Sequence, residues 1–159
     1  MNILGIDPGY GRVGWGVINY DHKKAYFTAC ECIITDAKLP FTTRLEQVFD
    51  EVNDIIKRHG IDELAVESIF FNTNTKTAML ASQARGVILL AGIKAKIPVF
   101  DYTPLQVKQA LIGYGRADKK QIQTMLQFHL QMKEIITQDD AADALAIALT
   151  HAYTNQRLK

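Results

Sequence analysis

The chain has 159 residues, of which 48% are hydrophobic and 22% charged, a composition that indicates one globular domain and excludes a disordered chain. The formal net charge is only +1, so total charge by itself does not indicate a polyanionic partner. The longest apolar run, Gly86–Ile93, is too short to cross a bilayer, and Asp7 interrupts the first apolar run, so we expect a soluble, cytoplasmic protein without a signal peptide.

The first part of the chain predicts three strands joined by tight turns. Residues 2–6 form a short apolar run that ends on Asp7, and the turn residues that follow, Pro8 and Gly9, break the strand. Residues 13–20 and 25–35 predict two further strands with a polar hairpin turn between them. Asp7 therefore stands at the end of a rigid strand, although an Asp before Pro-Gly is also a common turn former.

An amphipathic helix and a buried strand come next. Apolar residues at helical spacing predict a helix over 42–59, which Gly60 ends. Residues 63–67 (Glu-Leu-Ala-Val-Glu) predict a short strand that ends on Glu67. Glu67 is thus a second carboxylate at the end of a predicted strand.

The middle of the chain is predicted to be mainly helical and is basic. It contains a helix over 74–95, a strand over 97–102, a helix that Thr103 caps, and a helix from Asp118 to about Met132. Between residues 72 and 120 there are eight Lys or Arg residues and only two acids. This asymmetry is compatible with a polyanionic partner and also with a merely solvated basic surface.

The last predicted helix, over 139–154, begins with three acids and continues as a very apolar segment. Asp140 and Asp143 are three residues apart and share a helix face. Acids at a helix N-terminus also stabilise the helix dipole, and we expect Asp139 to do only that. Because the apolar remainder must be buried on the sheet, the first turn is expected near the strand ends.

Four carboxylates from separate elements are therefore expected to converge: Asp7, Glu67, Asp140 and Asp143. Such a cluster repels itself unless cations fill it, and hard divalent cations such as Mg²⁺ or Mn²⁺ suit oxygen ligands. Two such ions about 3.5–4 Å apart can activate water and stabilise the leaving oxygen in phosphodiester hydrolysis. The element order predicts an α/β fold, with a mixed five-stranded sheet and helices on both faces.

Five motifs, in this order, resemble those of the RuvC family of Holliday-junction resolvases. They are Leu4–Gly9, Ala65–Glu67 with Phe70, Gln83–Val87, Gln106–Gln109 and Asp140–Ala148. The resemblance covers nearly the whole chain and implies a single RNase H-like nuclease domain over residues 1–159. It also implies a homodimer, Mg²⁺ or Mn²⁺ as cofactor, paired symmetric nicking of four-way junctions in recombination and repair, and cooperation with the RuvA–RuvB branch-migration complex.

The resemblance also assigns roles to residues. It makes the four carboxylates the metal ligands and catalytic acids, with Lys119 as a catalytic helper. Phe70 would contact junction bases, although Phe71 beside it leaves open which ring does so. The candidate DNA-binding residues are Phe70, Lys76, Arg85, Lys108, Arg116, Lys119 and Lys120. Whether Asp139 contributes to the metal site also stays open.

Three alternative functions remain at this point. A YqgF-type nuclease shares the first motif, and an actin-like phosphotransferase has a similar Asp-x-Gly after its first strand. The actin-like fold needs a second lobe, for which 159 residues leave no room. A junction-binding protein without catalysis is the third alternative, but all four acids are present. Metal-dependent nicking of a synthetic junction, compared with ATP hydrolysis, would separate these functions.

The predicted helix over 74–95 indicates an oligomer. Val87–Ala91 is apolar all round, and such a segment is buried on more than one side. A two-fold partner that uses the same patch would cover the second side, and the alternative is a neighbouring helix of the same chain. We expect four small residues to let two such helices approach closely: Ala84, Gly86, Ala91 and Gly92.

Overall fold

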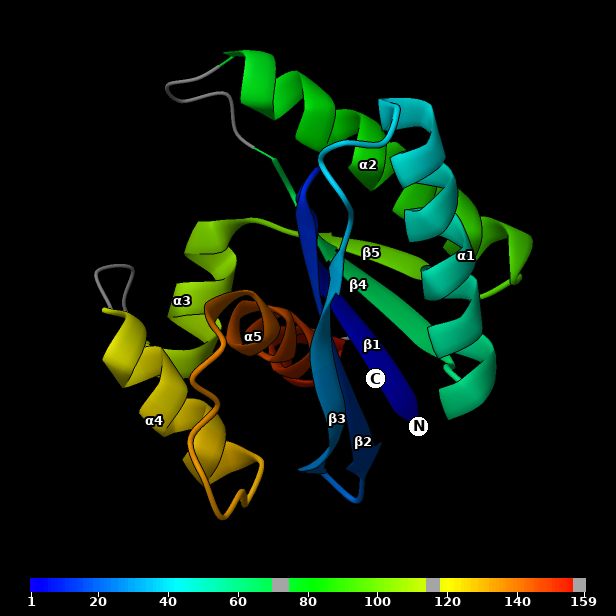
Figure 1. Cartoon of the computed structure of the whole chain (residues 1–159). Coiled ribbons are helices and arrows are strands. Elements are labelled where there is room, and N and C mark those ends of the chain that lie inside the picture. The colour runs from blue at the N-terminus through cyan, green and yellow to red at the C-terminus, as the bar shows by residue number, and fades with distance from the viewer. Residues whose placement is uncertain (70–74, 114–117, 156–159) are drawn as a thin grey trace.

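The computed structural model describes residues 1–69, 75–113 and 118–155, which form one five-stranded sheet between two layers of helices (Figure 1). The predicted contacts of Phe70, Phe71 and Arg116 fall outside the described residues. The strand order is β3-β2-β1-β4-β5. The strands are β1 (Asn2–Asp7), β2 (Arg12–Asp21), β3 (Lys24–Ile34), β4 (Glu63–Glu67) and β5 (Val99–Tyr102).

The sheet is mixed, as the element order predicts. β1, β2 and β3 form an antiparallel meander, whereas β4 and β5 run parallel to β1. Because β1 pairs with β4, the ends of these two strands lie side by side, with Ile6 opposite Val66. Asp7 and Glu67 are the next residues of the two strands, so the topology brings them to the same edge of the sheet.

Helices cover both faces of the sheet (Figure 1). α1 (Phe41–His59) and α2 (Thr75–Lys94) lie on one face, and α3 (Pro104–Ile112), α4 (Lys119–His129) and α5 (Asp139–Asn155) lie on the other. None of these helices, within the described residues, is long and apolar enough to cross a membrane.

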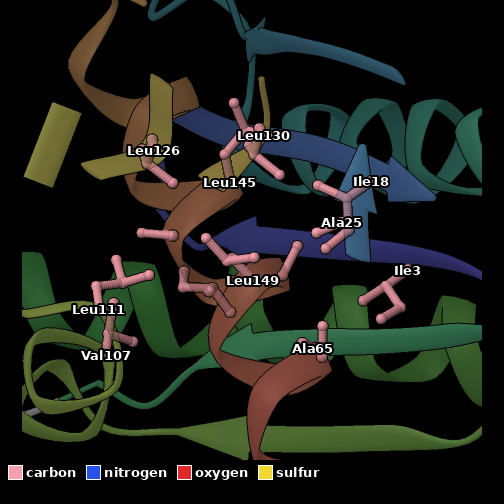
Figure 2. Close-up of a cluster of buried hydrophobic side chains, with 14 of the residues drawn as sticks. Ile3, Ile18, Ala25, Ala65, Val107, Leu111, Leu126, Leu130, Leu145 and Leu149 are labelled. Carbon is pink, nitrogen blue, oxygen red and sulfur yellow. The ribbon is translucent and has the colours of Figure 1, made fainter. Parts of the chain in front are cut away.

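Alternating strand residues supply two separate cores. Leu4 and Leu64 are buried with α1 and α2, whereas their neighbours Ile3 and Ala65 are buried with α5. Figure 2 shows the second core, in which side chains of α3, α4 and α5 gather over strands β1 to β4. Both faces of these strands are thus buried by helices, which explains why their sequences are nearly continuous apolar runs.

Local signals predicted most helix ends correctly. Gly60 ends α1 in the left-handed conformation with φ 55°. Thr103 and Asp118 each accept a hydrogen bond from the backbone three residues on, and Gln106 and Gln121 complete the two capping boxes. α4 ends at His129, earlier than expected, because Gln131 takes a positive φ of 52°. β5 begins at Val99 because Ile97 still donates to the carbonyl of Gly92, at the end of α2.

The expected cluster of small residues on α2 is wrong for three of its four members. Ala84 and Ala91 are buried, and a Cβ at Gly92 would meet Leu64 and Val99 of the chain's own sheet. These residues let α2 approach its own sheet and do not form an outer surface. Of the four, only Gly86 faces open space.

α5 lies closely against β1 and β2 because these strands carry glycines where the helix crosses them. A Cβ at Gly5 would lie 2.1 Å from the carbonyl oxygen of Ala144, and one at Gly14 would lie 1.9 Å from that of Asp140. Real Cβ atoms do not approach so closely, so only glycine permits this contact. The close packing brings the first turn of α5 to the strand edge that carries Asp7.

Candidate active site

Asp7 is the last residue of β1, and the turn after it is held by a buried arginine. Arg44 of α1 donates from Nη2 to the carbonyl of Tyr10 at 2.7 Å and from Nε to the hydroxyl of Thr35 at 2.9 Å. The backbone of Thr35 also donates to the carbonyl of Gly11. These bonds connect the turn to α1 and to the residue that follows β3. The backbone next to Asp7 is therefore held in place.

The acids of α5 lie beside Asp7. Gly14 is the β2 partner of Asp7, and the backbone of Asp140 lies directly over Gly14. The Asp140 carboxylate forms an ion pair with Arg12, with 3.2 Å between Nε and Oδ2, and the thiol of Cys32 is 3.9 Å from it. Asp143 follows one helical turn later, on the same face of α5.

The pKa values show that the carboxylates act on one another. Burial raises the pKa of Asp7 to about 7, with further contributions from Asp143 and then Asp140. Burial, followed by the charges of Asp7 and Asp143, raises the pKa of Glu67 to about 7. The pKa of Asp143 is also raised, again mainly by burial. Carboxylates from β1, β4 and α5 therefore share one partly desolvated site, as the sequence predicts.

Two lysines face this acidic group. A cavity of about 240 Å³ is lined by Glu67 and Asp143 together with Lys108 of α3 and Lys119 of α4. The charge of Lys119 lowers the pKa of Asp7, and that of Lys108 lowers the pKa of Glu67. The cavity lining thus contains both carboxylates and ammonium groups, which suits a phosphodiester held between metal ions and ammonium groups.

Asp139 does more than stabilise the helix dipole. Its carboxylate accepts a hydrogen bond from Lys119 Nζ at 2.9 Å, and this bond raises the pKa of Lys119. The expectation that Asp139 acts only on the helix end is therefore incomplete. It also holds the ammonium group that faces the other acids.

The remaining predicted DNA-binding residues occupy different surroundings. Lys76 is exposed in the first turn of α2, and Lys120 lines a neighbouring cavity beside Asp118 and Thr124. Arg85 points inward, where it donates to the carbonyl of Glu67 at 3.1 Å and forms an ion pair with Asp101. Lys120 thus lies beside the cavity that Lys119 lines, and Arg85 contacts the backbone of Glu67.

The donor set fits a divalent cation by its chemistry. In residues 1–69, 75–113 and 118–155, no three His, Cys, Asp or Glu side chains already stand in a metal-binding arrangement. Asp140 forms an ion pair with Arg12, so its carboxylate is engaged by a cation of the chain itself. Even so, four carboxylates gathered from three elements, among which Asp7, Glu67 and Asp143 have pKa values raised mainly by burial, are the oxygen ligands that Mg²⁺ and Mn²⁺ prefer.

Sequence reasoning missed the two arginines on the β2 and α1 side of the site. Arg12 and Arg44 lie outside the basic middle segment, and their partners are distant in sequence. The only available signal for Arg44 was a charged residue at a position that α1 buries. A second missed feature is the buried His151, which contacts Glu63 Oε2 at 2.5 Å and the Tyr102 hydroxyl at 2.7 Å. This network joins Glu63, at the start of β4, to Tyr102, the β5 partner of Glu67.

Comparison with known proteins gives consistent matches over nearly the whole chain. A family model described as crossover junction endodeoxyribonuclease RuvC matches residues 3–151. The crossover junction endodeoxyribonuclease RuvC of Clostridioides difficile (strain 630) is 47% identical over 156 residues, covering 98% of this chain and 92% of that protein. The RuvC of Brevibacillus brevis is 49% identical over 152 residues, covering 96% and 92%.

Solved structures match equally well. Thermus thermophilus RuvC superposes with a TM-score of 0.91 at 36% identity, covering 99% of this chain and 96% of that one. The same protein in complex with Holliday junction substrate gives a TM-score of 0.93. The yeast mitochondrial Holliday junction resolvase Ydc2, at 11% identity and a TM-score of 0.70, shares the fold. The predicted RNase H-like fold is confirmed by these likenesses.

Proposed function

This chain belongs to the RuvC family of crossover junction endodeoxyribonucleases, and on that premise we propose that it resolves Holliday junctions. It is a structure-selective endonuclease that makes paired symmetric nicks in homologous recombination and DNA repair. The observation that carries the proposal is the cavity in which Glu67 and Asp143 face Lys108 and Lys119, beside Asp7. The YqgF-type and actin-like alternatives have no comparable support.

The four acids are the proposed metal ligands: Asp7, Glu67, Asp140 and Asp143. Mg²⁺, or Mn²⁺ in its place, would be held as a pair of ions, which supply an activated water and stabilise the leaving oxygen. The chain itself holds the carboxylates on β1, β4 and α5 and shields them partly from water. The carboxylates repel one another in this site, and a bound cation would relieve that repulsion.

The lysines are proposed to hold the scissile backbone. Lys119 faces Asp7 and Asp143 while Asp139 anchors it, so it is the proposed catalytic helper. Lys108 lies on the same wall of the cavity. Further phosphate contacts are proposed at Lys76, Arg116 and Lys120. Phe70 is proposed to stack on a junction base, at about 1–3 kcal/mol per base.

A homodimer is proposed through the outer face of α2. Met79, Leu90 and Ile93 are 58%, 50% and 65% exposed and, with Gly86, form one stripe along the helix. Their spacing of seven, four and three residues places them on one side. Large exposed apolar side chains in a stripe favour a partner that covers them. A dimer also suits the two-fold symmetry of a four-way junction, which needs two matched cuts.

The remaining expectations follow from family membership. We propose that the dimer acts on four-way junction DNA in the cytoplasm, together with the RuvA–RuvB branch-migration complex. Thermus thermophilus RuvC has been solved with a Holliday junction substrate, and its likeness to this chain over 99% of the residues supports a shared mode of binding.

The central test is nicking of a synthetic four-way junction by variants of the acids. Asp7→Asn, Glu67→Gln, Asp140→Asn and Asp143→Asn should each reduce Mg²⁺-dependent nicking by about a thousandfold or more, since each removes a charge that holds the catalytic metal. Junction binding, measured by gel shift without metal, should remain because the basic surface is intact.

Asp139→Asn is the matched control for these variants, since it neutralises a neighbouring acid that binds Lys119 and is not a proposed metal ligand. It should retain measurable nicking. A variant of any proposed ligand that nicks at the wild-type rate would remove that residue from the metal site. ATP hydrolysis without junction nicking in the wild type would contradict the proposed function itself.

A further inference from the structure

Arg85 has an unusual place among the basic residues of the chain, because its guanidinium joins three elements behind the active site. It belongs to α2, donates from Nε to the carbonyl of Glu67 at 3.1 Å, and forms an ion pair through Nη2 with Asp101 of β5. Its side chain is only 21% exposed. Glu67 is the last residue of β4, so the bond is made to the backbone of a proposed metal ligand.

We propose that Arg85 is a positioning residue for Glu67 and does not contact DNA. This inference rests on the proposed function and replaces the DNA-binding role that sequence analysis assigned to Arg85. Two of its donors are directed to protein acceptors, and Arg85 is not among the residues that line the cavity with Glu67, Lys108 and Lys119.

The sheet register explains why one side chain can hold both partners. In the parallel pair of β4 and β5, Val66 lies opposite Asp101 and Glu67 opposite Tyr102. The carbonyl of Glu67 and the carboxylate of Asp101 are therefore near neighbours at the carboxyl ends of the two strands. The ladder continues for one more bond, from the backbone of Ser68 to the carbonyl of Tyr102 at 2.8 Å. Arg85 secures this last part of the ladder, where strand ends otherwise fray.

Arg85 acts on Glu67 through the backbone and not through its charge. The pKa of the Glu67 carboxyl is raised by burial, Asp7 and Asp143 and is lowered by Lys108. Arg85 does not contribute to this shift. An arginine suits this task because its planar fork can donate in two directions at once. A lysine keeps the positive charge, but all its donors lie on one nitrogen, so it lacks the two separate nitrogens that Arg85 uses for these two contacts.

The same contact relates the proposed dimer face to the active site. Gly86, the next residue, faces open space within the exposed stripe of α2, while Arg85 points to the sheet. A displacement of α2 would therefore move the Arg85 guanidinium and, with it, the carbonyl of Glu67. Arg85 thus links the position of α2 to the backbone of a proposed metal ligand.

The test compares Arg85→Lys with wild type in three measurements. Outer-shell partners of metal ligands typically change metal affinity or activity by about 10–100-fold when mutated, so we expect losses of that size in two of them. These are the Mn²⁺ affinity of the DNA-free protein, followed by the electron paramagnetic resonance of free Mn²⁺, and the rate of junction nicking. The third, the salt dependence of junction binding in EDTA, should be unchanged.

Asp101→Asn provides a second variant that keeps Arg85 itself and weakens only the ion pair. It should shift Mn²⁺ affinity and nicking in the same direction by a smaller factor, and the double variant should be no worse than Arg85→Lys alone. Lys57→Ala, an exposed basic residue on α1, is the control and should leave all three measurements unchanged.

Two results would overturn the proposal. One is a wild-type Mn²⁺ affinity and nicking rate in Arg85→Lys, since a retained charge suffices for a phosphate contact but not for the bridge. The other is a salt slope that falls by about 0.9 in Arg85→Ala, the value of one lost phosphate contact. If the wild type does not nick junctions, the proposed function fails, whereas the Mn²⁺ measurement on DNA-free protein still decides the role of Arg85.

Discussion

Asp7 illustrates how the site works at the scale of single residues. Its carboxylate is surrounded by Asp140 and Asp143 and is largely removed from water, and its pKa rises to about 7 as a result. An ordinary Asp has a pKa of 3.8 and would be fully ionised at neutral pH. The ionised form of Asp7 therefore weakens the metal-free fold, and a bound cation would reverse this effect.

This electrostatic cost predicts a pH-dependent gain of stability in Asp7→Asn. Because the folded-state pKa is raised, the stability that this carboxyl contributes is complete below pH 4 and is lost as the pH rises through about 7. In EDTA at pH 8 the variant should be more stable than wild type by about 1–3 kcal/mol, since a tenfold change in acidity corresponds to about 1.4 kcal/mol. Urea unfolding at pH 4, 6 and 8 measures this difference.

The matching control is the addition of Mg²⁺ at pH 8. The wild type should gain stability by mass action, whereas Asp7→Asn should gain much less. An Asn variant that is less stable than wild type at pH 8 in EDTA would show that the Asp7 carboxylate is not under electrostatic strain.

At the scale of elements, the site depends on how closely α5 lies on the sheet. Gly5, Gly14 and Gly16 lie under this helix, and a Cβ at each would come within 3 Å of it. Since Asp140 and Asp143 stand in the first two turns of α5, the separation between helix and sheet sets their distance from Asp7. A packing feature in the strands thus controls the geometry of acids on a helix.

Gly14→Ala should therefore affect both stability and activity. Its Cβ would lie 1.9 Å from the carbonyl oxygen of Asp140, a backbone atom that only a shift of α5 can remove. We expect a loss of about 1–3 kcal/mol, the usual cost of overpacking, and a fall in nicking of about tenfold or more. Urea unfolding and the nicking assay measure the two effects.

Gly11→Ala is the matched control, because its Cβ would make only an ordinary contact, 3.6 Å from Arg44 Nη2. It should lose far less stability than Gly14→Ala. Equal losses in the two variants would mean that the close approach of α5 does not determine the effect.

At the scale of the whole molecule, the exposed apolar stripe on α2 is the surface proposed for the dimer. Leu90→Glu should produce monomers, because a charge at the centre of an apolar interface is buried without a partner. Leu90 is 50% exposed in the subunit, so the substitution should not disturb its fold. Sedimentation velocity at micromolar concentration measures the oligomeric state, and nicking of both junction strands should become unpaired.

Leu39→Glu serves as the control, since Leu39 is 43% exposed but lies before α1, away from the stripe. It should remain a dimer. A wild-type protein that sediments as a monomer and still makes paired nicks would contradict the dimer proposal, and so would a Leu90→Glu variant that remains dimeric.

The sequence by itself determined most of the elements and singled out the acids that are proposed as metal ligands. Helix ends at Gly60, Thr103 and Asp118 follow from interactions within a few residues, so local sequence contains the necessary signal. The mixed sheet follows from the order of the strands, and Asp7 and Glu67 were recognisable as strand ends. The RuvC motifs, kept in order along the chain, carried the family assignment.

Only the tertiary structure decided which way side chains point and which partners they meet. Arg85 counts as one more positive charge in the sequence, yet its partners on β4 and β5 turn it inward. Three of the four small residues of α2 are likewise buried inside the chain, and Gly86 alone of the four faces open space. Lys119 and Asp139 are 20 residues apart, and Cys32 and Asp140 are 108 apart. Contacts over such distances depend on the packing of whole elements, which sets each side chain's direction and which no local pattern encodes.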